Sequence, residues 1–277
     1  MRITAVASMV VVVALTATAS AQTNPSLDAC NGKNNLPPDA QISGCTTLIQ
    51  SGKYSGKNLA IVYTNRCNGH NHKRAYDAAI SDCSQAIKLD PTYATPYYNL
   101  GVIHYNKKEY DLAIKDSTEA IKRDPKRGPA YTTRANAYSD KGDHDHAILD
   151  YGEAVRINPR DPISLNNRCD EYALLSQFVA ARLDCDEALK IRPNHVNTLR
   201  HRALVLLALG KFDDALADFA NILQQEPKDA DSLFGRGTAK LKKGDVAGGN
   251  DDVAAAKTLD QNVEKDFWRY GAPAEKH

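Results

Sequence analysis

The sequence predicts an all-α protein built as a solenoid of antiparallel helix pairs. Three observations lead to this prediction. Prolines recur with a spacing of 34 residues, small residues recur at fixed positions between them, and larger apolar residues keep helical spacing around the small ones. The prolines are Pro91, Pro125, Pro159, Pro193 and Pro227.

The chain begins with a segment that has the layout of a secretory signal. Arg2 gives a positive start, an apolar run extends from Ile3 to Leu15, and Ala19-Ser20-Ala21 supplies small residues for cleavage. We therefore predict that residues 1–21 are a signal peptide cleaved after Ala21, and that the mature protein is periplasmic or secreted. An uncleaved anchor helix is the alternative, but the run is short for a bilayer core of roughly 30 Å.

A second alternative for this region is lipidation at Cys30. The sequence Leu27-Asp28-Ala29-Cys30 loosely resembles a lipoprotein cleavage site, but polar residues 22–26 separate it from the apolar run. This separation favours export without a lipid.

Residues 22–59 are interpreted as a cysteine-containing, degenerate N-terminal repeat followed by a loop. Residues 39–49 align with residues 77–87, which lie in the second helix of the first full repeat. We therefore expect a helix over 39–50 and a loop over 51–58, which contains two glycines.

Six repeats of 34 residues follow, at 60–93, 94–127, 128–161, 162–195, 196–229 and 230–263. Position 20 of the first five repeats is alanine, and position 32 is the recurring proline; the sixth repeat has Gln261 there. We expect two helices in each repeat, with a turn near position 15 and the proline ending the second helix. Residues 264–277 are the predicted cap and tail, in which Phe267 and Trp268 would cover the last repeat.

The motifs of the second repeat resemble the tetratricopeptide repeat family. Tyr97-Tyr98-Asn99-Leu100-Gly101 and Tyr110-Asp111-Leu112-Ala113-Ile114 match its pattern closely, and the resemblance covers about 204 of 277 residues. It implies a right-handed superhelix in which each repeat buries its apolar face against its neighbours. The cysteine-bearing leader also resembles exported repeat proteins of α-proteobacteria.

The six cysteines recur at two positions of the repeat. Cys67 and Cys83 occupy positions 8 and 24 of the first repeat, and Cys169 and Cys185 occupy the same positions of the fourth. Positions 8 and 24 face one another if the hairpin turns near position 16, so we predict three disulfides, Cys30–Cys45, Cys67–Cys83 and Cys169–Cys185. The alternative is that each cysteine is only a small packed apolar residue.

Charge and motifs exclude several functions. Lys and Arg total 35 and Asp and Glu 34, a balance that argues against nucleic acid or an anionic membrane as the main partner. No apolar segment after residue 21 is long enough to span a membrane. The clusters His70-Asn71-His72 and His144-Asp145-His146 lack a third ligand, and no catalytic motif is present. We therefore predict no enzyme activity, no cofactor and no metal site.

The family resemblance places a binding surface on the first helix of each repeat, at positions 2, 5, 9 and 12. Asn side chains both donate and accept hydrogen bonds, which suits the backbone of an extended peptide; an ordinary solvated groove is the alternative. The basic residues that the family uses to clamp a chaperone carboxylate are replaced by Thr132, Asn197 and His201. The predicted groove residues are Thr64, Asn68, Tyr98, Tyr105, Asn136, Asn166, Arg200 and Phe234.

Taken together, these features predict an exported, non-enzymatic scaffold that binds a protein or an extended peptide in its concave groove. The alternative is a module that binds a cell-envelope glycan or a small ligand through the same Tyr and Asn residues. The sequence does not identify the partner.

Overall fold

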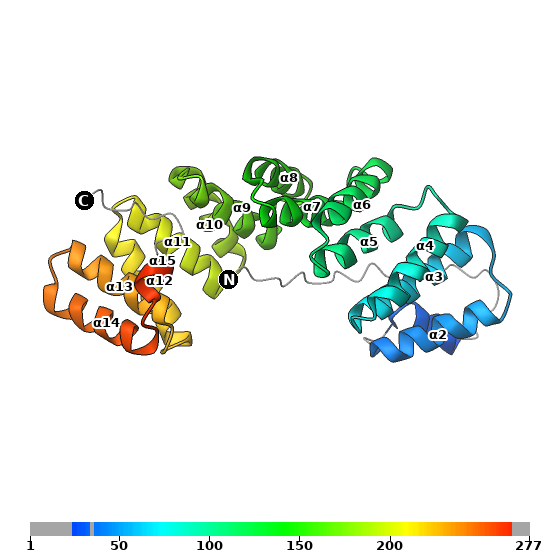
Figure 1. Cartoon of the computed structure of the whole chain (residues 1–277), viewed down its shortest axis with the longest axis horizontal. Helices are drawn as coiled ribbons and strands as arrows, with labels where there is room; N and C mark the ends of the chain where they lie inside the picture. The colour runs from blue at the N-terminus through cyan, green and yellow to red at the C-terminus, as the bar shows by residue number, and fades with distance from the viewer. Residues whose placement is uncertain (1–23, 34–35, 268–277) are drawn as a thin grey trace. The chain divides into compact units, whose positions relative to one another are not determined.

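The computed structural model describes residues 24–33 and 36–267, and all regular structure in these residues is helical (Figure 1). The predicted signal peptide and Trp268 lie outside the described residues. The chain divides into two compact units, one ending at Lys141 and the other beginning at Gly142. We call them the N-terminal unit and the C-terminal unit.

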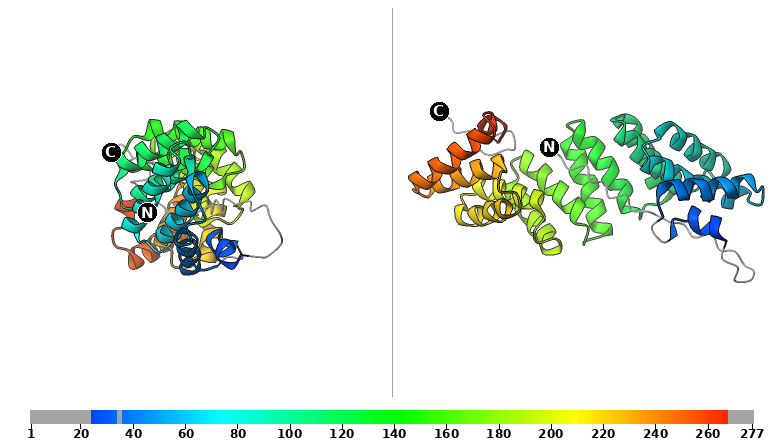
Figure 2. Two further views of the ribbon diagram at one scale, coloured as in Figure 1. Left: turned by 90° about the vertical axis from the view of Figure 1, so that its right-hand side faces the viewer. Right: turned by 90° about the horizontal axis from the view of Figure 1, so that it is seen from below.

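Consecutive helices pack against each other within each unit, and successive helices form antiparallel pairs (Figure 2). The N-terminal unit contains α1 (Pro25–Cys30), α2 (Pro38–Gln50), α3 (Gly56–His72), α4 (Tyr76–Leu89), α5 (Ala94–Asn106), α6 (Tyr110–Arg123) and α7 (Gly128–Asp140). The C-terminal unit contains α8 (His144–Ile157), α9 (Pro162–Leu174), α10 (Phe178–Ile191), α11 (Val196–Ala208), α12 (Phe212–Gln225), α13 (Ala230–Lys242), α14 (Val246–Leu259) and α15 (Val263–Phe267). The predicted fold class, an all-α protein of paired helices, is confirmed.

The helices end where the sequence expects them to end. Helix α4 stops at Leu89 and α6 at Arg123, in each case two residues before a recurring proline. Proline lacks the N–H that the helix ladder needs, and the residue before it avoids the α region. Helix α3 differs from the expectation, because it begins at Gly56, inside the segment expected to be a loop. The residues after Gly56 include no helix breaker, so the helix gains a turn at its start.

The turns between paired helices need a left-handed residue at position 15. Glycine occupies this position in three repeats, where Gly142, Gly210 and Gly244 have φ of 81°, 68° and 87°. The other three repeats place a residue with a side chain in the same conformation: Arg74, Lys108 and Ser176, with φ of 58°, 63° and 58°. Left-handed backbone costs such residues roughly 1–2 kcal/mol.

Paired helices approach each other closely at positions 8 and 24. The structure joins Cys67 to Cys83 and Cys169 to Cys185 there, each with a Cα–Cα distance of 5.5 Å, and joins Cys30 to Cys45. These are the three pairs predicted from the sequence. A cysteine at either position is fully buried, as each bridge lies in the core between its two helices.

An arginine–aspartate pair lies beside this crossing in several hairpins. Arg168 forms two hydrogen bonds with Asp184, and Arg202 forms two with Asp218, at distances of 2.6 to 2.8 Å. The same arrangement joins Arg66 to Asp82 and Arg236 to Asp252. The carboxylates hold the pKa of each guanidinium above its ordinary value, with the hydrogen bond as the largest cause.

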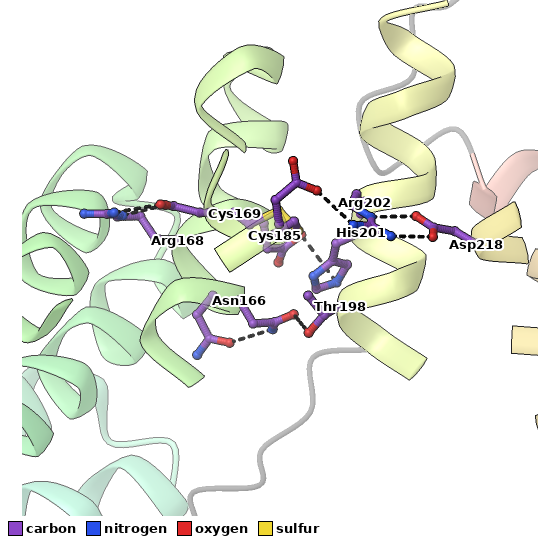
Figure 3. Close-up of a disulfide and its surroundings, with 12 residues drawn as sticks. Asn166, Arg168, Cys169, Cys185, Thr198, His201, Arg202 and Asp218 are labelled. Atoms are coloured by element: carbon purple, nitrogen blue, oxygen red, sulfur yellow. Dashed lines mark hydrogen bonds and ion pairs between the residues drawn. A yellow bond between two sulfur atoms is a disulfide. The ribbon is translucent and has the colours of Figure 1, made fainter. Parts of the chain in front are cut away.

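Figure 3 shows these interactions around Cys169–Cys185, where Arg202 faces Asp218 and Thr198 donates a hydrogen bond to Asn166. Bidentate pairs of this kind fix the angle between two helices as well as their separation. Sequence reasoning missed them, although the signal was present: Arg recurs at position 7 and Asp at position 23, always 16 residues apart.

Candidate functional site

A cavity of about 630 Å³ lies in the N-terminal unit, at the ends of α3, α5 and α7. The turns that follow α3 and α5 contribute Arg74 and Lys108 to its lining, and the last residue of α7 contributes Asp140. Cavities of this size accommodate several residues of a peptide or a small ligand.

Aromatic rings form one part of the lining. The rings of Tyr105 and Tyr110 lie 6.0 Å apart between centroids and are tilted by 49°. The hydroxyl of Tyr105 donates a hydrogen bond to Asp140 Oδ2 at 2.8 Å, which holds the ring between α5 and α7. Tyr76, the first residue of α4, adds a third ring.

Asn71 lines the cavity and carries an unsatisfied hydrogen-bond acceptor. Its side chain is 9% exposed, and its Oδ1 has no hydrogen-bond partner among the described residues. A buried acceptor without a partner costs roughly 1–3 kcal/mol. A bound N–H donor would remove that cost.

Two cations at the rim of the cavity have no carboxylate partner in the described part of the chain. Arg74 and Lys108 are exposed, while their sequence neighbours are engaged elsewhere: Lys73 with Asp39, and Lys107 with Glu109 at 2.9 Å. The lining therefore combines two available positive charges, aromatic rings and a buried amide oxygen.

The predicted groove residues of the N-terminal unit occupy different environments. Tyr105 lines the cavity, and Asn68 is half-buried on α3. Tyr98 is 6% exposed and packs with Val102 and with Ala130 of α7, and burial raises the pKa of its phenol. Thr64 donates to its own helix at Ala60 O, and Asn136 is buried on α7.

The predicted groove residues of the C-terminal unit are engaged with neighbouring side chains. Asn166 accepts a hydrogen bond from Thr198, and Arg200 forms an ion pair with Asp229 at 3.1 Å. Phe234 is 4% exposed and meets Phe267 of α15 edge to face, with centroids 5.0 Å apart. The structure therefore brings only Tyr105 of the eight predicted residues to the cavity.

Asn71 and Val102 also line the cavity, at positions 12 and 9 of the face that the sequence analysis assigned to binding, whereas other lining residues come from helix ends and turns. Asn106 is at position 13, and Arg74 and Lys108 are at position 15. A sequence signal existed, because position 15 carries a cation in the first two repeats and glycine in three of the others.

In the first histidine cluster, Nε2 of His70 lies 3.7 Å from Asp82 Oδ2, and both histidines of the second cluster lie beside carboxylates. Nδ1 of His144 lies 2.7 Å from Glu171 Oε2, and Nδ1 of His146 lies 2.8 Å from both carboxylate oxygens of Asp143. Within residues 24–33 and 36–267, no three His, Cys, Asp or Glu side chains gather in a metal-binding arrangement. No helix in the same ranges is long and apolar enough to cross a membrane.

Family models for this repeat match both units. A TPR repeat model matches residues 75–108, and tetratricopeptide repeat models match 94–127, 128–161 and 201–262. The chain is a tetratricopeptide repeat protein. This family is typically non-enzymatic, and its repeats suggest a protein partner. No curated protein matches this tetratricopeptide repeat protein in sequence.

Solved structures share its fold at low sequence identity. YrrB, described as a TPR protein with an unusual peptide-binding site, is 20% identical with a TM-score of 0.61, covering 65% of this chain and 93% of its own. PilF of Pseudomonas aeruginosa is 15% identical with a TM-score of 0.64, covering 76% and 94%. MamA is 18% identical with a TM-score of 0.57, covering 62% and 94%. At these identities the likeness establishes the tetratricopeptide repeat fold alone.

Proposed function

We propose that this tetratricopeptide repeat protein is an exported, non-enzymatic adaptor that binds a protein or an extended peptide in the concave groove of its repeats. The observation that carries the proposal is the cavity of the N-terminal unit, with the unpartnered acceptor of Asn71. An extended peptide supplies N–H donors along its length, so it can satisfy such an acceptor without a specialised ligand.

Export is supported by the three disulfides together with the signal-like start of the chain. Disulfides persist in oxidising compartments such as the periplasm and are rare in the cytosol. The proposed location is therefore the periplasm or the exterior of the cell.

Of the predicted groove residues, Tyr105 lines the cavity and is the one that we assign to partner binding in the N-terminal unit; it is 6% exposed and also packs with Ala113 and Ala137. Tyr98 and Phe234 belong to packed apolar clusters, so their truncation would open the core and would not report on binding. Tests of the groove need exposed residues instead.

The test is a crosslinking pull-down from the native cell envelope with the full chain and two variants. Asn106→Trp fills the cavity from an exposed position at the end of α5, and Gln50→Trp makes the same change at the exposed end of α2, away from the cavity. The proposal expects proteins that are recovered with the native chain and with Gln50→Trp but are lost with Asn106→Trp.

Two outcomes would contradict the proposal. Identical recovery with both variants would show that the cavity is not the binding site. Absence of specific protein capture, together with saturable binding of peptidoglycan fragments to the purified chain, would establish the glycan-binding alternative instead.

A further inference from the structure

We propose that the cavity of the N-terminal unit binds an extended acidic segment of the partner protein, with side-chain carboxylates on Arg74 and Lys108 and a backbone N–H on Asn71 Oδ1. This inference rests on the proposed function and specifies the chemistry of the segment that the same groove accepts.

The charges of the two turns favour an anionic occupant. Lys73 and Lys107 precede these cations in the chain and already have carboxylate partners, Asp39 and Glu109. Arg74 and Lys108 have none in the described residues, and both line the cavity. Asp140, the one acidic residue of the lining, accepts a hydrogen bond from Tyr105. The rim therefore has two cations available for carboxylates that the protein itself does not supply.

The backbone conformation of the two turns indicates that Arg74 and Lys108 are not there to stabilise the fold. Both occupy left-handed backbone, with φ of 58° at Arg74 and 63° at Lys108, at the position where three other repeats have glycine. An L side chain in this conformation is destabilising, so glycine would favour the fold. Ser176 carries the same backbone cost without a charge and outside the cavity, so it separates the effect of conformation from that of charge.

The buried amide of Asn71 favours a peptide over a simple anion. A simple carboxylate offers only acceptors at neutral pH, and Asn71 Oδ1 needs a donor. A peptide segment provides both groups, an N–H from its backbone and a carboxylate from a side chain.

The spacing of the cations sets the spacing of the acidic residues. Arg74 and Lys108 follow equivalent helices of successive repeats, and packed helices lie roughly 8–10 Å apart. An extended chain advances about 3.4 Å per residue. Two carboxylates separated by two or three positions along the segment would therefore reach one cation each, which distinguishes this site from a clamp around a single terminal carboxylate.

The experiment measures binding of labelled peptides to the oxidised full chain by fluorescence anisotropy. The probe is an acetylated and amidated peptide in which two glutamates are separated by one or two alanines and flanked by glycine and serine. Matched probes replace both glutamates with glutamine, or have a single glutamate and a free C-terminal carboxylate. Binding is measured at low and at physiological salt, since ion pairs at a surface weaken with ionic strength.

The decisive variant is Arg74→Gly combined with Lys108→Gly. This variant removes both charges and also removes the backbone strain at both left-handed positions. Its thermal unfolding temperature should therefore be equal to or higher than that of the native chain, while its affinity for the acidic probe falls about tenfold. Ser176→Gly is the matched control, because it relieves the same backbone strain in the C-terminal unit and should leave affinity unchanged. Asn71→Ala should weaken binding about fivefold through loss of the buried acceptor.

Three results would overturn the inference: equal affinity for the glutamate and glutamine probes, unchanged affinity in the double glycine variant, or preference for the free carboxylate terminus. The proposed function fails separately. If Asn106→Trp abolishes partner capture from the envelope but the double glycine variant does not, the groove binds a partner and the acidic chemistry is wrong. If the native chain captures no partner, the adaptor function itself is wrong.

Discussion

Two neighbouring hairpins of the N-terminal unit hold the same helix crossing by different means. In α3–α4, Cys67 and Cys83 at positions 8 and 24 form a disulfide. In α5–α6 the same positions hold Gly101 and Ser117, and a Cβ on Gly101 would lie 2.5 Å from Ser117 Oγ. A covalent bond holds one crossing, and a glycine without a side chain permits the other. The repeat therefore specifies how closely the two helices approach, while the residues that achieve this approach differ between repeats.

The ion pairs of the two hairpins differ in a parallel way. Asp82 in α4 accepts two hydrogen bonds from Arg66. In α5–α6 the arginine position holds Leu100, and Asp116, the counterpart of Asp82, forms a hydrogen bond of 2.8 Å with His104 Nδ1 instead. The α3–α4 hairpin is therefore cross-linked by a disulfide and an arginine, whereas α5–α6 depends on close packing and a histidine.

The largest effect is expected from removal of the covalent bond. Cys67→Ala combined with Cys83→Ala should lower the free energy of unfolding by about 3 kcal/mol, because the open loop regains its conformational entropy in the unfolded chain. Urea unfolding measures the loss, and amide hydrogen exchange should locate it in α3 and α4. The Cys169–Cys185 disulfide closes a loop of equal length, so Cys169→Ala combined with Cys185→Ala is the control for the size of the effect. A change below about 1 kcal/mol would mean that the bridge is redundant with packing.

Replacing the arginine of α3–α4 by the residue that α5–α6 carries should have the next largest effect. Arg66→Leu leaves Asp82, which is 5% exposed, without its main partner. We expect a loss of roughly 2–3 kcal/mol in urea unfolding, since a buried carboxylate without a partner is costly.

The control for this change is Lys122→Gln, which breaks an exposed pair with Glu119. Exposed ion pairs contribute at most about 1 kcal/mol. Equal losses for the two variants would show that solvent, rather than Arg66, stabilises Asp82.

The close packing of α5–α6 can be tested at its glycine. Gly101→Ala places a methyl group against Ser117 Oγ and within 3.2 Å of Ser117 N, so we expect a loss of about 1–2 kcal/mol despite the better helix propensity of alanine. Gly152→Ala in α8 is the control, because its nearest neighbour is Arg168 Nη1 at 3.4 Å, an ordinary contact. That variant should be neutral or slightly stabilised; an equal loss at both glycines would contradict the packing explanation.

The smallest expected effect is a pH dependence that arises in α3–α4. Burial lowers the pKa of His70 below its ordinary value of 6.5, and although Asp82 opposes this shift, Arg66 and Lys73 add to it. The unfolded chain therefore takes up a proton at a higher pH than the folded chain does. Stability should be full above pH 6.5 and should fall as the pH drops through 6.5 toward the folded pKa. His70→Gln should flatten this part of the curve of unfolding free energy against pH; an unchanged slope would exclude His70 as its source.

Repetition explains which features could be predicted. The recurring prolines and small residues lie in every repeat, so the helix pairs and the hairpin disulfides followed from the sequence with little error. The Arg–Asp pairs had an equally regular signal at positions 7 and 23, and finding them needed only the same alignment applied to charged residues.

The cavity could not be predicted in the same way. Position 5 carries Tyr98 and Phe234, and each is covered by a helix that follows it in the chain, Tyr98 by α7 and Phe234 by α15. Whether a side chain on the first helix of a repeat is covered depends on the size of its neighbours in the next helix, which periodicity does not specify. The lining combines residues at positions 9 and 12 of the expected face with residues at positions 13 and 15, where single repeats differ from the pattern.

The disulfides also limit how far the chain can be pulled. Each bridge withholds the residues of its loop from extension, with sequence separations of 15, 16 and 16. At about 3.4 Å per residue, and allowing for the span of the bridges themselves, an oxidised chain stretched between its ends would be roughly 145 Å shorter than the reduced chain. Under tension the loops within α1–α2, α3–α4 and α9–α10 would stay closed by their disulfides. The hairpins α5–α6 and α11–α12 have no disulfide, so they could unfold and extend fully.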